Sequence, residues 1–197
     1  MKMTVFEVPI FKYTIPNWIE RKATLMEALP KDGYTDFFAN KVNGLPPYID
    51  MLGQTIMECM QEFANNYPCP VMITSAWCER AKKYDMHGAH NHGATGYSGI
   101  LYVEYDQFEH EATRFWSPFT DPATGDLMEY QPIIREGDLV IFPSFMIHEG
   151  PMNKSDKERI IVSFNIMGED VMKAYYNGLN NKPLTRQEEI AQTENGE

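Results

Sequence analysis

The sequence is short of basic residues and lacks any long apolar run. Its 17 lysines and arginines stand against 28 aspartates and glutamates, so the 197-residue chain carries a formal net charge of −11 at pH 7. This charge repels phosphate backbones and disfavours a nucleic-acid polymer as a partner, although a single base or nucleotide stays open as a substrate. No apolar stretch reaches the roughly 18–20 residues that span a bilayer, so we expect no membrane segment.

Cysteine is also scarce. Cys59, Cys69 and Cys78 form no CxxC pair, which indicates reduced thiols and not a disulfide framework. Residues 1–4 begin no secretory signal peptide. Together these features predict a cytoplasmic protein.

The remaining composition predicts one globular domain. A hydrophobic content of 43% and an aromatic content of 13% indicate a well-filled core, and 197 residues suffice to bury it. We place the domain at residues 1–182, with a polar tail at residues 183–197. Within the domain, residues 1–69 form a helical support region and residues 70–168 form the core.

The support region combines one strand with two helices. Residues 5–13 are β-branched and aromatic with one proline, which suits an edge strand. A helix is expected from near Pro16, and the clearest helix covers residues 49–65, where apolar residues recur at helical spacing. The loop at residues 30–45 carries aromatic side chains, which either pin it to the core or form a lid.

From residue 70 onward, short strands alternate with turns rich in Gly, Pro, Asp and Asn. This pattern is typical of an antiparallel sandwich or barrel. The expected strands cover residues 71–78, 97–105, 112–116, 128–134, 138–142 and 159–167. A short helix is expected after them, at residues 171–176.

Three histidines form a candidate metal site. Alternate residues of a strand point to the same side, about 6.5 Å apart, so His90 and His92 can direct two imidazoles at one point. Nitrogen ligands lie about 2.0–2.2 Å from a divalent metal, so a third ligand must come from elsewhere, and His148, on the turn after the strand at 138–142, is the obvious supplier. His87 lies three residues before His90, which on a strand predicts the opposite side, so we expect it to be either exposed or a partner of the ligands and not a ligand itself. On these residues alone, surface histidines in a polar loop remain an alternative.

Arg159 begins the last expected strand, whose two faces differ. One face is apolar and is expected against the helices: Ile160, Val162, Phe164 and Ile166. The other is expected to face a polar cavity, since three of its four side chains are polar: Arg159, Ile161, Ser163 and Asn165. A guanidinium there can bind a carboxylate through two parallel hydrogen bonds. The alternative is a salt bridge with Glu158 or Asp156.

Taken together, these segments resemble a known family. The segments are Ser75-Ala76-Trp77, His90-Asn91-His92-Gly93, residues 98–103, residues 136–144 with His148, and residues 158–165. They are similar to the phage and bacterial 2-oxoglutarate/Fe(II)-dependent oxygenases, a prolyl-hydroxylase-like family, in a His-x-His variant. The resemblance covers about residues 75–166.

The resemblance implies a fold and a site. The fold is mainly β with flanking α: a double-stranded β-helix, or cupin-like jelly roll, with N-terminal helices. His90, His92 and His148 hold Fe(II), while Arg159, Ser163 and Tyr102 hold the cosubstrate 2-oxoglutarate. The family more commonly has Asp at the place of His92. Three carboxylates are therefore alternative ligands: Asp85, Glu104 and Asp106.

The implied function is hydroxylation of an unidentified substrate with release of succinate and carbon dioxide. The chain would then reside in the host cytoplasm if a phage encodes it, and a homodimer stays open. Two other functions remain. One is a cupin-type three-His dioxygenase that uses no 2-oxoglutarate. The other is a non-catalytic metal-binding phage protein on the same scaffold.

Overall fold

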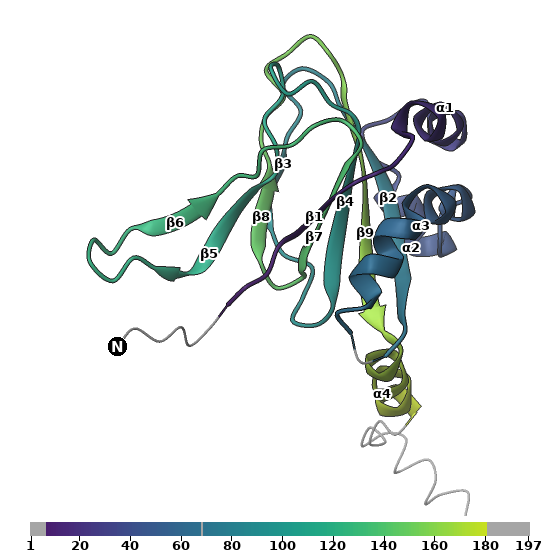
Figure 1. Cartoon of the computed structure of the whole chain (residues 1–197), viewed down its shortest axis with the longest axis vertical. Helices are drawn as coiled ribbons and strands as arrows, with labels where there is room; N and C mark the ends of the chain where they lie inside the picture. The colour runs from purple at the N-terminus through teal and green to yellow at the C-terminus, as the bar shows by residue number, and fades with distance from the viewer. Residues whose placement is uncertain (1–6, 68, 181–197) are drawn as a thin grey trace, which may run out of the picture.

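The computed structural model describes residues 7–67 and 69–180, so the expected tail at residues 183–197 lies outside the described residues. Within them the chain forms two antiparallel sheets with helices on one side (Figure 1). The larger sheet has the order β1-β7-β4-β9-β2, with bounds β1 (Phe11–Thr14), β7 (Asp138–Pro143), β4 (Tyr97–Glu104), β9 (Arg159–Gly168) and β2 (Val71–Ala81). The smaller sheet has the order β3-β8-β5-β6, with bounds β3 (His87–His90), β8 (Ile147–Gly150), β5 (Arg114–Thr120) and β6 (Leu127–Tyr130). The predicted mainly β jelly roll with flanking helices is confirmed.

Helices α1, α2 and α3 lie against the outer face of the larger sheet, while α4 lies beyond the end of β9 (Figure 1). Their bounds are α1 (Trp18–Ala28), α2 (Phe37–Asn43), α3 (Ile49–Ala64) and, after β9, α4 (Glu169–Asn180). In α3, the helical spacing of Leu52, Ile56 and Phe63 puts all three on one buried face, where each is 0% exposed. Burying such a side chain contributes roughly 1.5–3 kcal/mol, so this face holds the helix on the sheet.

β9 carries the two faces that the sequence predicts. Its apolar set, which includes Val162 and Phe164, packs with the helices in one hydrophobic cluster. A Cβ on Gly99 of β4 would lie 2.3 Å from the Phe164 ring, so the neighbouring strand needs glycine there. The other face of β9 looks toward the smaller sheet, where Ile161 packs in a second cluster with Phe115 of β5. The polar side chains of β9 therefore lie between the sheets.

The expected strands of the core are all present, with shifted ends. β6 ends at Tyr130, short of the predicted 134, and β5 extends to Thr120. The expected aromatic loop at residues 30–45 contains α2. A strand was expected at His90 and His92, but β3 ends at His90, and the short strand β8 was not expected. No helix in the described ranges is long and apolar enough to cross a membrane. The three cysteines are free thiols, as predicted.

Candidate metal centre

Three histidines from the smaller sheet and its margin converge on one point. β3 pairs with β8 so that His90 lies opposite His148, and the two ring centroids are 4.4 Å apart. His92 follows β3 in a loop, where its backbone N–H donates to the Ser144 carbonyl at 2.9 Å. Each of the three offers a nitrogen within 4.8 Å of the others. His92 was expected on a strand with His90, but the loop brings it to the same point.

The hydrogen bonds of the ring nitrogens determine which nitrogen atom each histidine can offer to a metal ion. His90 Nδ1 lies 2.7 Å from the Gly88 carbonyl oxygen, and His148 Nδ1 lies 2.9 Å from that of Met146. A carbonyl oxygen only accepts, so both Nδ1 atoms carry the proton and both Nε2 atoms keep a free lone pair.

His92 is held in the same sense by side chains. Its Nδ1 lies 2.8 Å from Asn165 Oδ1 and 2.7 Å from Ser98 Oγ. Asn165 Nδ2 donates in turn to Ser75 Oγ at 2.8 Å, which orients the amide with its oxygen toward His92. Such outer partners orient a metal-binding imidazole and set its tautomer.

The resulting donor set fits a divalent cation. His90 Nε2 and His92 Nε2 are 3.1 Å apart. Two ligands at about 2.1 Å from an octahedral ion, at right angles, are about 3.0 Å apart, so the observed separation matches neighbouring positions on one ion. Among the described residues, the cluster of potential metal ligands consists of these three histidines and includes no carboxylate.

The alternative carboxylate ligands are bound elsewhere. Asp85 Oδ2 accepts from the Lys82 backbone N–H at 2.9 Å. Glu104 pairs with Lys22, and Asp106 pairs with Lys157 at 2.5 Å. The geometry therefore favours His92 as the third ligand.

Burial keeps these imidazoles neutral, as a metal ligand must be. It lowers the pKa of His148 to about 3 and that of His92 to about 4, and it lowers the pKa of His90 as well. His148 was expected on a turn, but it lies on β8 with 3% exposure, and its ring centroid is 4.7 Å from that of Phe142. This apolar packing is the cause of its large shift.

Two further groups lie next to the cluster: His87, which was expected to be exposed or beside the ligands, and Glu79, which was not expected. His87 stacks on His90 with ring centroids 4.1 Å apart and an interplanar angle of 13°. The prediction that His87 faces away is wrong, because an irregular register between His87 and His90 puts both rings on one side. His87 Nδ1 lies 2.9 Å from Oε1 of Glu79, which is 5% exposed and also accepts from Trp77 Nε1 at 2.9 Å. The hydrogen bond to Glu79 raises the pKa of His87.

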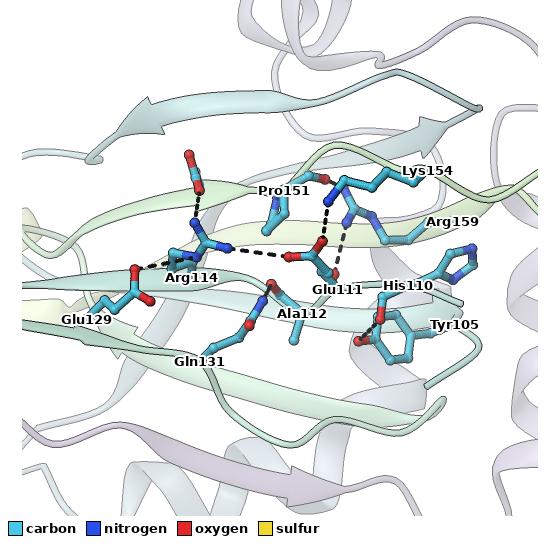
Figure 2. A network of polar contacts seen from close by, with 11 residues as sticks. Tyr105, His110, Glu111, Ala112, Arg114, Glu129, Gln131, Pro151, Lys154 and Arg159 are labelled. Carbon is cyan, nitrogen blue, oxygen red and sulfur yellow. Dashed lines mark hydrogen bonds and ion pairs between the residues drawn. The ribbon is translucent and has the colours of Figure 1, made fainter. Parts of the chain in front are cut away.

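Arg159 is buried, with 5% exposure. Figure 2 shows its guanidinium between two backbone carbonyls, Glu111 at 3.0 Å and Pro151 at 2.8 Å. The alternative salt bridges do not form: Glu158 pairs with Arg80 at 2.7 Å and Asp156 pairs with Lys83 at 2.9 Å. Within the described ranges, Arg159 has no carboxylate partner.

The other two expected cosubstrate residues lie between the sheets. Ser163 lines a small cavity of about 20 Å³ together with the three histidines and Thr113. Tyr102 is 1% exposed, and its hydroxyl donates to Thr113 Oγ1 at 2.9 Å. Arg159 and Tyr102 are not among the residues that line this cavity. The structure therefore brings Ser163 to the histidines, but it does not bring Tyr102 and Arg159 to the cavity wall.

The fold and the three histidines define a jelly roll with a candidate metal site, and a comparison of sequences relates it to a known family. Residues 75–165 match the family model described as "Putative 2OG-Fe(II) oxygenase". This part of the chain, which carries the three histidines and Arg159, is similar in sequence to that family of 2-oxoglutarate/Fe(II) oxygenases. The predicted family and enzyme class are confirmed. None of the curated proteins matches the sequence.

Several solved structures share the fold. HygX from Streptomyces hygroscopicus with iron bound is similar with a TM-score of 0.60 and 11% identity, over 82% of this chain and 83% of that one. AviO1 from Streptomyces viridochromogenes Tue57 has a TM-score of 0.59 and 14% identity, over 82% and 90%. The viral collagen prolyl hydroxylase vCPH from Paramecium Bursaria Chlorella virus-1, as a 2OG complex, has a TM-score of 0.53 and 15% identity, over 80% and 94%.

Proposed function

We propose that the chain is an Fe(II)- and 2-oxoglutarate-dependent dioxygenase that hydroxylates an organic substrate. The observation that carries the proposal is the convergence of three Nε2 atoms whose Nδ1 atoms are all bound to oxygen acceptors. Bound Fe(II) supplies the redox chemistry in which O2 converts 2-oxoglutarate to succinate and carbon dioxide and hydroxylates a substrate C–H bond, one oxygen atom entering each organic product. HygX, solved with iron and again with nickel and 2-oxoglutarate, supports these cofactors.

The chain contributes orientation and exclusion of water. His90, His92 and His148 hold the metal, and the Asn165–Ser98 pair keeps the His92 ring in place. The ring of Phe142 packs on His148, which is only 3% exposed. This metal ligand is therefore shielded from solvent.

The charge of Arg159 supports 2-oxoglutarate as cosubstrate. A guanidinium buried with only neutral carbonyl partners is costly, and an anionic ligand compensates for that cost. The distal carboxylate of 2-oxoglutarate supplies this charge, with Ser163 and Tyr102 as hydroxyl partners. The cavity beside Ser163 is only about 20 Å³ in volume, so side chains around it must move apart to admit the cosubstrate.

The same charge argues against the two rival functions. A cupin-type dioxygenase without 2-oxoglutarate, or a non-catalytic metal-binding protein, has no use for a buried arginine that lacks a counter-charge. A cytoplasmic location and a phage or bacterial source remain predictions from the sequence, as does the possible homodimer.

Anaerobic titration tests the proposal. The metal-free protein should bind one Fe(II) per chain, and 2-oxoglutarate should then produce a visible metal-to-ligand charge-transfer band. Admission of O2 should release succinate. Iron binding without the band would favour the cupin-type dioxygenase, and no iron binding would refute the metal site itself.

A further inference from the structure

A second cavity, of about 540 Å³, opens next to His90 and His92. Four aromatic side chains form much of its wall: Tyr34, Phe37, Phe38 and Trp77. Phe37 and Phe38 begin α2, the helix found within the expected aromatic loop. The cavity is therefore built from that segment on one side and from β2 and the histidines on the other.

The aromatic rings stand nearly at right angles to one another. Phe37 and Trp77 have centroids 5.1 Å apart and an interplanar angle of 77°, and Phe37 and Phe38 have centroids 5.4 Å apart at 78°. Trp77 also lies edge-to-face with His92, at 5.3 Å. All four aromatic side chains nevertheless line the cavity, and the π face of an aromatic ring carries negative potential that attracts cations.

The charges around the cavity favour the same kind of ligand. Of the described residues that line it, none is Lys or Arg, so a phosphate or carboxylate group has no permanently charged partner there. Its acidic residue is Glu79, which is bound to Trp77 and His87. The whole chain carries a net charge of −11, which attracts cations and repels anions at long range.

We propose that this cavity binds an alkylammonium group of the substrate. The inference rests on the proposed function, since it assigns a substrate class to that same site. The cation packs against the cavity wall that Phe37, Phe38 and Trp77 form, and neighbouring carbon atoms of the substrate lie toward His90 and His92. A neutral alkyl group would gain the apolar contacts but not the attraction to the π faces.

Three probes of nearly equal size separate these contributions. Choline, its uncharged isostere 3,3-dimethylbutan-1-ol and the anion 3,3-dimethylbutanoate are titrated into the metal-free full-length protein, with binding followed by tryptophan fluorescence and calorimetry. Choline should bind about tenfold more tightly than the alcohol, which corresponds to about 1.4 kcal/mol, and the anion should bind most weakly. Equal affinities for choline and the alcohol, or tighter binding of the anion, would overturn the inference.

Two variants locate the binding site. Phe37→Leu keeps an apolar side chain but removes a π face, so it should reduce the preference for choline over the alcohol to about threefold or less. Phe38→Ala should weaken choline binding several-fold, and because Phe38 is 73% exposed its removal costs little packing. Phe108→Ala is the matched control, since Phe108 is 90% exposed and lines a different cavity. Choline binding that Phe37→Leu and Phe38→Ala leave unchanged would place the cation elsewhere and refute the proposal.

Because the probes are titrated into metal-free protein, the test of this inference is separate from the test of the proposed function. Fe(II) and 2-oxoglutarate binding are measured on the same preparation. If both bind while the probes show no preference for the cation, the substrate class is wrong and the oxygenase stands. If the cation is preferred but Fe(II) does not bind, the cavity stands as a cation site and the oxygenase falls.

Discussion

Replacing Arg159 with lysine tests how the buried guanidinium functions. In the structure Nη1 and Nη2 donate to the carbonyls of Glu111 and Pro151, at 3.0 and 2.8 Å. Lysine keeps the positive charge but has one compact ammonium, so it cannot make the paired, planar contact with a carboxylate. A hydrogen bond to a charged group contributes about 1.5–3 kcal/mol. The loss of one of the two proposed hydrogen bonds between the guanidinium and the 2-oxoglutarate carboxylate sets the scale of the expected loss of affinity.

We therefore expect Arg159→Lys to weaken 2-oxoglutarate binding by at least about tenfold, or about 1.4 kcal/mol. Fe(II) affinity should barely change, because Arg159 is not one of the three clustered ligands. The assay is the anaerobic titration of the Fe(II) protein, read by the charge-transfer band. Arg135→Lys is the matched control, since Arg135 is exposed.

An unchanged 2-oxoglutarate affinity in Arg159→Lys would refute this reasoning. The oxygenase would remain, but its carboxylate clamp would lie elsewhere. A loss of Fe(II) binding in the same variant, with the fold intact, would instead show that Arg159 supports the metal site.

Three further predictions follow from the geometry of the histidines. His148→Ala should abolish stoichiometric metal binding, and it should lower the free energy of unfolding by about 1–3 kcal/mol because it opens a cavity beside Phe142. Calorimetric metal titration measures the first effect and urea unfolding the second. A variant that retains its metal affinity would refute the assignment. Asn165→Ala should weaken metal binding about 10–100-fold, because it removes the acceptor that orients the His92 ring. Asn165→Asp keeps an acceptor and should lose less metal affinity. Equal losses of metal affinity in the two variants would contradict the positioning role of Asn165. Burial lowers the pKa of His148 to about 3 and that of His92 to about 4. Between about pH 6.5 and these values, the unfolded chain binds protons that the folded chain does not. The metal-free protein should therefore lose stability as the pH falls through that range. Urea unfolding at pH 7 and pH 5 measures this loss, and a protein equally stable at both would contradict it.

The sequence predicts the sheet core well because its strands carry clear apolar signals. In β9 the alternation of Val162 and Phe164 with Ser163 and Asn165 is visible in the letters, and the structure puts the two sets on opposite faces. The two-residue spacing of His90 and His92 already suggested a shared metal with His148 as the third ligand, and the resemblance to the oxygenases supported this interpretation.

Other features left no signal in the sequence pattern. β3 and β8 are four residues each and rich in histidine and glycine, so they lack apolar alternation. The irregular register between His87 and His90 reversed the expected side of His87, and nothing in the local sequence marks it. Asn165 was placed on the polar face, but its bond to His92 joins residues 73 positions apart and depends on the tertiary fold.

The most direct test of the metal site is a crystal structure of the protein grown anaerobically with Fe(II), with the ion located by anomalous scattering. One ion should lie about 2.0–2.2 Å from the Nε2 atoms of His90, His92 and His148, with its remaining positions open. An ion bound instead by Glu79 and His87, or by Asp85, would contradict the assignment.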